Sequence, residues 1–121
     1  MKAMLEGLRV LVVEDEAMIA MLIEDMLIDF GCAILGPAAD TTQALAIIEE
    51  ARFDVAILDV NLSGERTVSI AETLRSKGIP FVFATGYGIS GIHDEFKGQP
   101  ILTKPFKDAE LRAALRSLIM K

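Results

Sequence analysis

Short apolar runs recur along the chain, and each run is followed by polar residues that packing alone does not explain. Four of them are Val10–Val13, Val55–Leu58, Pro80–Ala84 and Pro100–Thr103. Runs this apolar are typical of parallel strands buried on both faces of a sheet. Segments with helical periodicity lie between the runs. The alternation predicts an α/β fold with a parallel, doubly wound sheet.

The expected elements alternate from one end of the chain to the other. We expect strands at 8–13, 32–36, 55–58, 80–84 and 101–102, and helices at 16–30, 41–51, 67–76, within 87–98 and at 107–120. Pro37 closes the second expected strand. The fourth expected helix contains three glycines (88, 91 and 98), so it should be short and weakly formed.

Two helices show a clear apolar face. In the first, the inward residues are expected to be Ile19, Leu22, Ile23, Met26, Leu27 and Phe30, and in the last they are Leu111, Leu115 and Leu118. The first helix also carries Met18, Met21 and Ile28 outside this stripe. They belong either to the core of an unusually apolar helix or to a docking face, and we slightly favour docking.

Composition narrows the class of protein. The chain has 121 residues, 52% of them hydrophobic, which suits one globular domain. Its net charge of -6 argues against nucleic acid and anionic membranes as partners. Cys32 is the single cysteine, which excludes an internal disulfide and fits a reducing compartment. We find no secretory leader and no apolar stretch near the roughly 20 residues of a membrane span, so a cytoplasmic protein is expected.

Five chemically distinctive residues follow the expected strands. Glu14 and Asp15 come after the first, Asp59 after the third, Thr85 after the fourth and Lys104 after the fifth. Because the carboxyl ends of parallel strands meet at one edge of the sheet, these side chains should lie together. Any one of them alone could be a helix cap or a turn residue. Their joint occurrence on the same edge favours a functional site.

The chemistry of this cluster predicts a magnesium site. Neighbouring carboxylates repel one another, so a cation stabilises them. Oxygen ligands without histidine or cysteine select a hard divalent ion, and Mg²⁺ fits best. We expect Asp15 and Asp59 to bind it directly and Glu14 to bind it through water.

Lysine and threonine complete the requirements for phosphoryl transfer. An ammonium and a hydroxyl beside a metal can position and neutralise phosphoryl oxygens, the roles we expect for Lys104 and Thr85. An aspartate can itself be the nucleophile and form an acyl phosphate. Asp59 stands alone on the middle strand and is the expected phosphoacceptor.

At these residues the sequence resembles the receiver domains of bacterial two-component response regulators, over essentially the whole chain. The matching segments are Val12–Glu16, Leu58–Asn61, Ala84–Gly86 and Thr103–Phe106. The resemblance implies a flavodoxin-like (βα)5 fold with strand order 2-1-3-4-5. It also implies two-component phosphorelay signalling rather than enzymatic turnover, with only self-phosphorylation and autodephosphorylation.

The resemblance assigns roles to the site residues. It implies that Asp59 accepts a phosphoryl group from a histidine kinase or a histidine phosphotransfer protein. Lys104 would pair with that group, Thr85 would hydrogen-bond to it, and the Lys104–Pro105 bond would be cis. Mg²⁺ would be held by Asp15, Asp59 and the backbone carbonyl of Asn61, with Glu14 in support.

Two features of the sequence concern how phosphorylation would be transmitted to the rest of the protein. Ile101 stands where the family usually has an aromatic residue that changes rotamer with the threonine. The run from Pro80 to Tyr87 resembles variant receivers with a Phe-Ala-Thr-Gly motif followed by tyrosine, which are associated with alphaproteobacterial signalling. Tyr87 either gates water or supplies the missing aromatic, or it is an exposed loop residue. His93 is expected on the surface.

The last expected helix runs to the end of the chain, so we expect a single receiver domain over residues 1–121 with no output domain. It would act on an unknown downstream protein, as a monomer or a weak phosphorylation-dependent homodimer. The main alternative is a small Mg²⁺-dependent phosphohydrolase that attacks through aspartate. Asn61 argues against it, because such enzymes place a second acid two residues after the nucleophile. A degenerate scaffold is also disfavoured, because the acids, Thr85 and Lys104 are all present.

Overall fold

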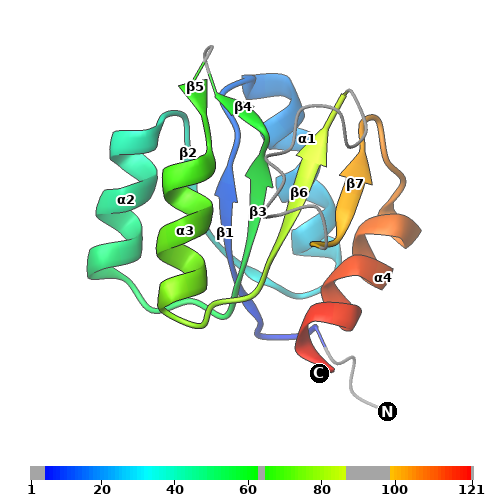
Figure 1. Ribbon diagram of the computed structural model, residues 1–121. Coiled ribbons are helices and arrows are strands. Elements are labelled where there is room, and N and C mark those ends of the chain that lie inside the picture. Colours follow the sequence, from blue (N-terminus) through cyan, green and yellow to red (C-terminus); the bar gives the residue numbers. More distant parts are fainter. Residues whose placement is uncertain (1–4, 63–64, 87–98, 121) are drawn as a thin grey trace.

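Parallel strands form the centre of the molecule. The computed structural model describes residues 5–62, 65–86 and 99–120 (Figure 1). Five strands pair in parallel in the order β2-β1-β3-β6-β7. They are β1 (Arg9–Val13), β2 (Ala33–Ala38), β3 (Val55–Asp59), β6 (Phe81–Thr85) and β7 (Ile101–Thr103). The predicted fold class and the order 2-1-3-4-5 are confirmed.

Helices cover both faces of this sheet (Figure 1). Helices α2 (Thr41–Glu50) and α3 (Val68–Ser76) lie on one face, and α1 (Ala17–Asp29) and α4 (Asp108–Ile119) lie on the other. These are the four helices of the described residues. The further helix that we expected falls in 87–98, outside the described residues.

The sheet separates two apolar cores. Successive residues of a strand point to opposite faces, so each central strand contributes to both cores. Leu11 and Leu58 pack on the side of α2 and α3, whereas Val10 and Ile57 pack on the side of α1 and α4. The expected inward residues of the last helix, Leu111, Leu115 and Leu118, are all buried. The central strands are therefore held from both sides, which fixes the position of the residues at their ends.

Strand β2 is longer than expected. We placed its end before Pro37, but pairing resumes beyond the proline, with Ala38 opposite Val13. The register shifts here because Gly36 has φ +96, a conformation that glycine tolerates and that allows a bulge. The Gly36–Pro37 peptide bond is cis. The bulge keeps β2 paired with β1 up to the point where the acidic residues begin.

A short hairpin after β3 was not predicted. Its strands are β4 (Asn61–Leu62) and β5 (Glu65–Arg66), which pair antiparallel at the edge toward which the main strands point (Figure 1). Leu62 is fully buried, and the Thr67 hydroxyl donates to the carbonyl of Val60 at 3.3 Å. These contacts attach the segment after Asp59 to the core.

Helix α1 presents more apolar surface than the sequence suggested. Ile23 and Leu27 are buried as expected, but Leu22 is 58% exposed, so its assignment to the inward face was wrong. Residues are about 100° apart around a helix, and Leu22 lies well off the face that contains Ile23 and Leu27. Met18 and Met21 are exposed too, which excludes the core interpretation for them. None of the helices in the described residues is both long enough and apolar enough to cross a bilayer.

Candidate functional site

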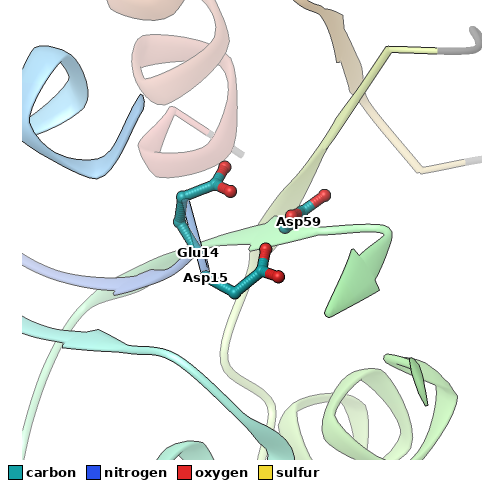
Figure 2. Close-up of side chains that lie close together, drawn as sticks. All are labelled: Glu14, Asp15 and Asp59. Atoms are coloured by element: carbon teal, nitrogen blue, oxygen red, sulfur yellow. The ribbon is translucent and has the colours of Figure 1, made fainter. Parts of the chain in front are cut away.

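Three carboxylates meet at the carboxyl edge of the sheet. Glu14 and Asp15 directly follow β1, and Asp59 is the last residue of β3, its neighbour in the sheet. One carboxylate oxygen from each residue lies within 4.8 Å of the others (Figure 2). Glu14 and Asp59 are buried, and Asp15 is half-buried. The predicted convergence of the three acids is therefore confirmed.

Lys104 directly follows β7, an edge strand of the sheet, and its side chain reaches this cluster. Its ammonium Nζ lies 2.7 Å from Oε1 of Glu14 and 3.3 Å from Oδ1 of Asp59. Burial disfavours the charged ammonium, but the hydrogen bond and charge of Glu14 and the charge of Asp59 outweigh it, so the pKa of Lys104 is raised above its ordinary value. The lysine is therefore charged at neutral pH and compensates two buried acids.

Backbone pairing brings Lys104 and Thr85 to the same edge. Thr85, the last residue of β6, is buried, and its carbonyl accepts a hydrogen bond from the backbone N–H of Lys104 at 2.7 Å. One residue earlier on β6, Ala84 pairs with Asp59. The Lys104–Pro105 peptide bond is cis, as the resemblance implied. Thr85 and Lys104 thus come from adjacent strands beside the expected phosphoacceptor.

Other expected participants lie partly outside what the structure describes. Asn61 begins β4 two residues after Asp59, and its backbone pairs with Arg66. Ile101 is half-buried and packs against the core on the side of α2 and α3. Tyr87 and His93 fall within 87–98, outside the described residues. Their expected roles stay predictions.

The donor set of the cluster fits a magnesium ion. Glu14, Asp15 and Asp59 offer only carboxylate oxygens, the ligands that hard divalent cations prefer. Lys104 supplies one positive charge against three acids, so the cluster remains negative overall. A dication at Asp15 and Asp59 would neutralise that excess.

One feature of the site was not predicted from the sequence, namely what holds Glu14 in place. Its backbone N–H donates to the carbonyl of Ala38 at 2.9 Å, directly after the bulge at Gly36. Oε2 of Glu14 accepts from the backbone N–H of Glu16 at 3.2 Å, while Oε1 binds Lys104. In the sequence, the only indication of the bulge that makes this contact possible is the Gly36–Pro37 pair, which we interpreted as the end of a strand.

Comparison with known proteins identifies the family. The family described as the response regulator receiver domain matches residues 10–116. The chain belongs to this family. Receiver domains are regulatory modules of two-component signalling that interact with histidine kinases or phosphotransfer proteins, and a phosphohydrolase is not favoured.

The receiver is similar to proteins from several bacteria. It is 32% identical over 124 residues to the DNA-binding response regulator MtrA of Mycolicibacterium paratuberculosis, covering 93% of this chain and 52% of MtrA. The chain thus spans about half the length of that relative.

Among solved structures, the chain is similar to receivers that it covers over almost their whole length. SdrG from Sphingomonas melonis Fr1 is 40% identical, with a TM-score of 0.85, and the match covers 93% of this chain and 97% of SdrG. The receiver domain of the sensor histidine kinase PA1611 from Pseudomonas aeruginosa is 29% identical, with a TM-score of 0.84 over 95% of this chain and 99% of that domain. That structure holds a magnesium ion in its active site cleft.

Proposed function

We propose that Asp59 accepts a phosphoryl group from a histidine kinase or a histidine phosphotransfer protein. The environment of the Asp59 carboxylate supports this most directly. The Lys104 ammonium Nζ lies 3.3 Å from Oδ1 of Asp59, and a carboxylate oxygen of Asp15 lies within 4.8 Å of an Asp59 oxygen. An oxygen of Asp59 would attack phosphorus, forming the new P–O bond. The bond from phosphorus to the donor imidazole breaks, and its electron pair leaves with the imidazole nitrogen.

Asp15, Asp59 and the backbone carbonyl of Asn61 would hold Mg²⁺, with Glu14 supporting it through water. The oxygen-only donor set of the cluster supports this ligand assignment. When bound, the ion would neutralise charge on the phosphoryl oxygens. Asn61 lies two residues after Asp59 and begins strand β4. The next residue, Leu62, is buried and anchors this strand to the core.

Lys104 and Thr85 would hold the phosphoryl group once it is attached. Lys104 already lies beside Asp59, and Thr85 ends the strand next to it. A phosphoryl group on Asp59 would add negative charge next to the Lys104 ammonium, which can form charge-assisted hydrogen bonds with the phosphoryl oxygens. We propose no turnover of external substrates, only self-phosphorylation and autodephosphorylation.

The change in charge at Asp59 would switch binding to a downstream protein. SdrG, 40% identical to this chain, has a BeF3-activated conformation, which supports a conformational response in this receiver too. The half-buried Ile101 lies opposite Phe83 in the sheet, so a signal could leave through packing rather than through an aromatic rotamer. We propose that the receiver is a monomer or a weak homodimer that forms on phosphorylation.

Intact mass after incubation with Mg²⁺ and acetyl phosphate tests this function. We expect one acid-stable, base-labile phosphoryl adduct that is absent in Asp59→Asn. Asp25→Asn, which makes the same change on the exposed surface of α1, should keep the adduct. An adduct that survives Asp59→Asn would rule out the proposed acceptor. Steady turnover of phosphomonoesters would favour the hydrolase instead.

A further inference from the structure

The hairpin that follows the proposed phosphoacceptor is closed at its base by a side chain. In the antiparallel register of β4 and β5, Asn61 lies opposite Arg66. Continued by one position, this register joins Val60 and Thr67, and there the hydroxyl of Thr67 donates to the carbonyl of Val60 at 3.3 Å. Val60 and Thr67 are 8% and 3% exposed, so this hydrogen bond lies away from water.

Thr67 uses its hydroxyl differently from most threonines at the start of a helix. It lies between β5 and α3 as the N-cap residue of α3, and its carbonyl accepts from the N–H of Ala71 at 3.0 Å (Figure 1). A threonine at an N-cap usually turns its side-chain oxygen toward the first turn of its own helix. Among the described residues of α3, no N–H receives such a bond from Thr67. The hydroxyl instead donates back across the hairpin, to the residue after Asp59.

Asn61 has an anchor on each side of it in the chain. Before it, the N–H of Val60 donates to the carbonyl of Ala84 at 3.1 Å, and the carbonyl of Val60 accepts from Thr67. After it, the fully buried Leu62 fixes the chain to the core on the side of α2 and α3. The position of the Asn61 backbone therefore depends on both anchors.

From this arrangement we propose that Thr67 is a positioning residue for the metal site. Its hydroxyl holds the peptide after Val60, so that the carbonyl of Asn61 is placed for Mg²⁺ before the ion binds. The proposal rests on the proposed Mg²⁺ site, and it assigns no contact between Thr67 and the ion. Without the hydroxyl, the loop would hold its binding position for only part of the time. The apparent affinity for an ion falls in proportion to that fraction.

Three variants separate the hydroxyl from the rest of the side chain. Thr67→Val removes the hydroxyl and keeps the shape, whereas Thr67→Ser keeps the hydroxyl and should restore the behaviour of the wild type. Thr73→Val is the matched control, because the hydroxyl of Thr73 also donates to a backbone carbonyl, that of Ser69 within α3, at 2.8 Å. If Thr67→Val does not fold, Thr67→Ala takes its place in both measurements.

Two quantities are measured by NMR. The first is the dissociation constant for Mg²⁺, from amide shifts during titration with MgCl₂ at constant ionic strength. The second is the rate of hydrogen exchange at the N–H of Val60 in EDTA. A neutral hydrogen bond contributes a free energy that corresponds to roughly fivefold in an equilibrium constant. We expect Thr67→Val to bind Mg²⁺ about two- to fivefold more weakly than Thr73→Val, and to exchange the Val60 amide up to about fivefold faster.

Equal Mg²⁺ affinities for Thr67→Val and Thr73→Val overturn the proposal, even if both variants are less stable than the wild type. Weaker binding that Thr67→Ser does not restore, or that comes without faster exchange at Val60, overturns it too. If the wild type itself does not bind Mg²⁺, the proposed metal site fails first. Binding of Mg²⁺ by the wild type with no effect of Thr67→Val refutes only the role of Thr67.

Discussion

Removing the lysine ammonium should destabilise the receiver and make its stability depend on Mg²⁺. In Lys104→Met, the carboxylates of Glu14 and Asp59, with side chains 1% and 8% exposed, lose the cation at 2.7 and 3.3 Å. Breaking a fully buried ion pair costs about 3–5 kcal/mol, and a hydrogen bond to a charged group contributes about 1.5–3 kcal/mol. Because the lysine keeps some contact with water, we expect a loss of about 2–3 kcal/mol in the free energy of unfolding.

Thermal unfolding followed by circular dichroism measures this loss. For a domain of 121 residues, each kcal/mol corresponds to about 4 °C, so the midpoint should fall by about 8–12 °C in EDTA. Saturating Mg²⁺ should raise the midpoint of Lys104→Met more than that of the wild type, because the uncompensated acids bind the dication more tightly.

Lys77→Met is the matched control, since Lys77 is an exposed lysine at the end of α3. Its midpoint should stay close to that of the wild type with and without Mg²⁺. Equal midpoints for Lys104→Met and the wild type in EDTA would refute the reasoning. Loss of Mg²⁺ binding in Lys104→Met would show that the proposed ligand set is wrong.

Three further predictions concern backbone geometry, pH and docking. Gly36→Ala places a Cβ 2.7 Å from the backbone oxygen of Val12, and overpacking of this kind costs about 1–3 kcal/mol. Urea should therefore unfold Gly36→Ala more readily than Gly78→Ala, because Gly78 also has a positive φ (+72) but has open space around its Cβ position. Because the pKa of Lys104 is raised in the folded protein, its charged ammonium contributes stability in full below the ordinary lysine pKa of about 10.4. This stability is lost as the pH rises through the higher pKa of the folded state. The difference in free energy of unfolding between the wild type and Lys104→Met should therefore close only in strong alkali. Replacing the exposed Met21 and Leu22 with serine should change the free energy of unfolding by less than about 0.5 kcal/mol. The double variant should nevertheless accept phosphate from the cognate kinase more slowly, while its reaction with acetyl phosphate is unchanged. An unchanged rate of transfer from the kinase would exclude this face from docking.

Apolar patterning was sufficient to predict the sheet. The buried strands β1, β3 and β6 are so uniformly apolar that few other structures could satisfy them, and parallel topology then places Asp15, Asp59, Thr85 and Lys104 on one edge. Local sequence also located α4, because its buried residues Leu111, Leu115 and Leu118 follow the helical period. These predictions depended on burial patterns that each segment carries by itself.

Features that depend on contacts between segments were missed or misread. Proline after Gly36 indicated a strand end, but the bulge lets β2 pair again with β1. Leu22 was assigned inward because apolar residues lie on more than one side of α1, so the pattern alone does not reveal which side faces the sheet. The pairing of Lys104 with Glu14 spans the two strands β3 and β6 that lie between β1 and β7, a distance that no sequence spacing specifies. Sequence reasoning thus found the members of the site but not their partners.

Chemical trapping of the phosphoryl group tests the central claim most directly. Borohydride reduces an acyl phosphate to an alcohol, so a phosphorylated aspartate becomes homoserine and can be located by peptide mass spectrometry. After phosphotransfer from a histidine kinase or phosphotransfer protein in Mg²⁺, we predict homoserine at position 59 and at no other position. Homoserine at position 15, or none under conditions in which the donor loses its phosphoryl group to the receiver, would contradict the account.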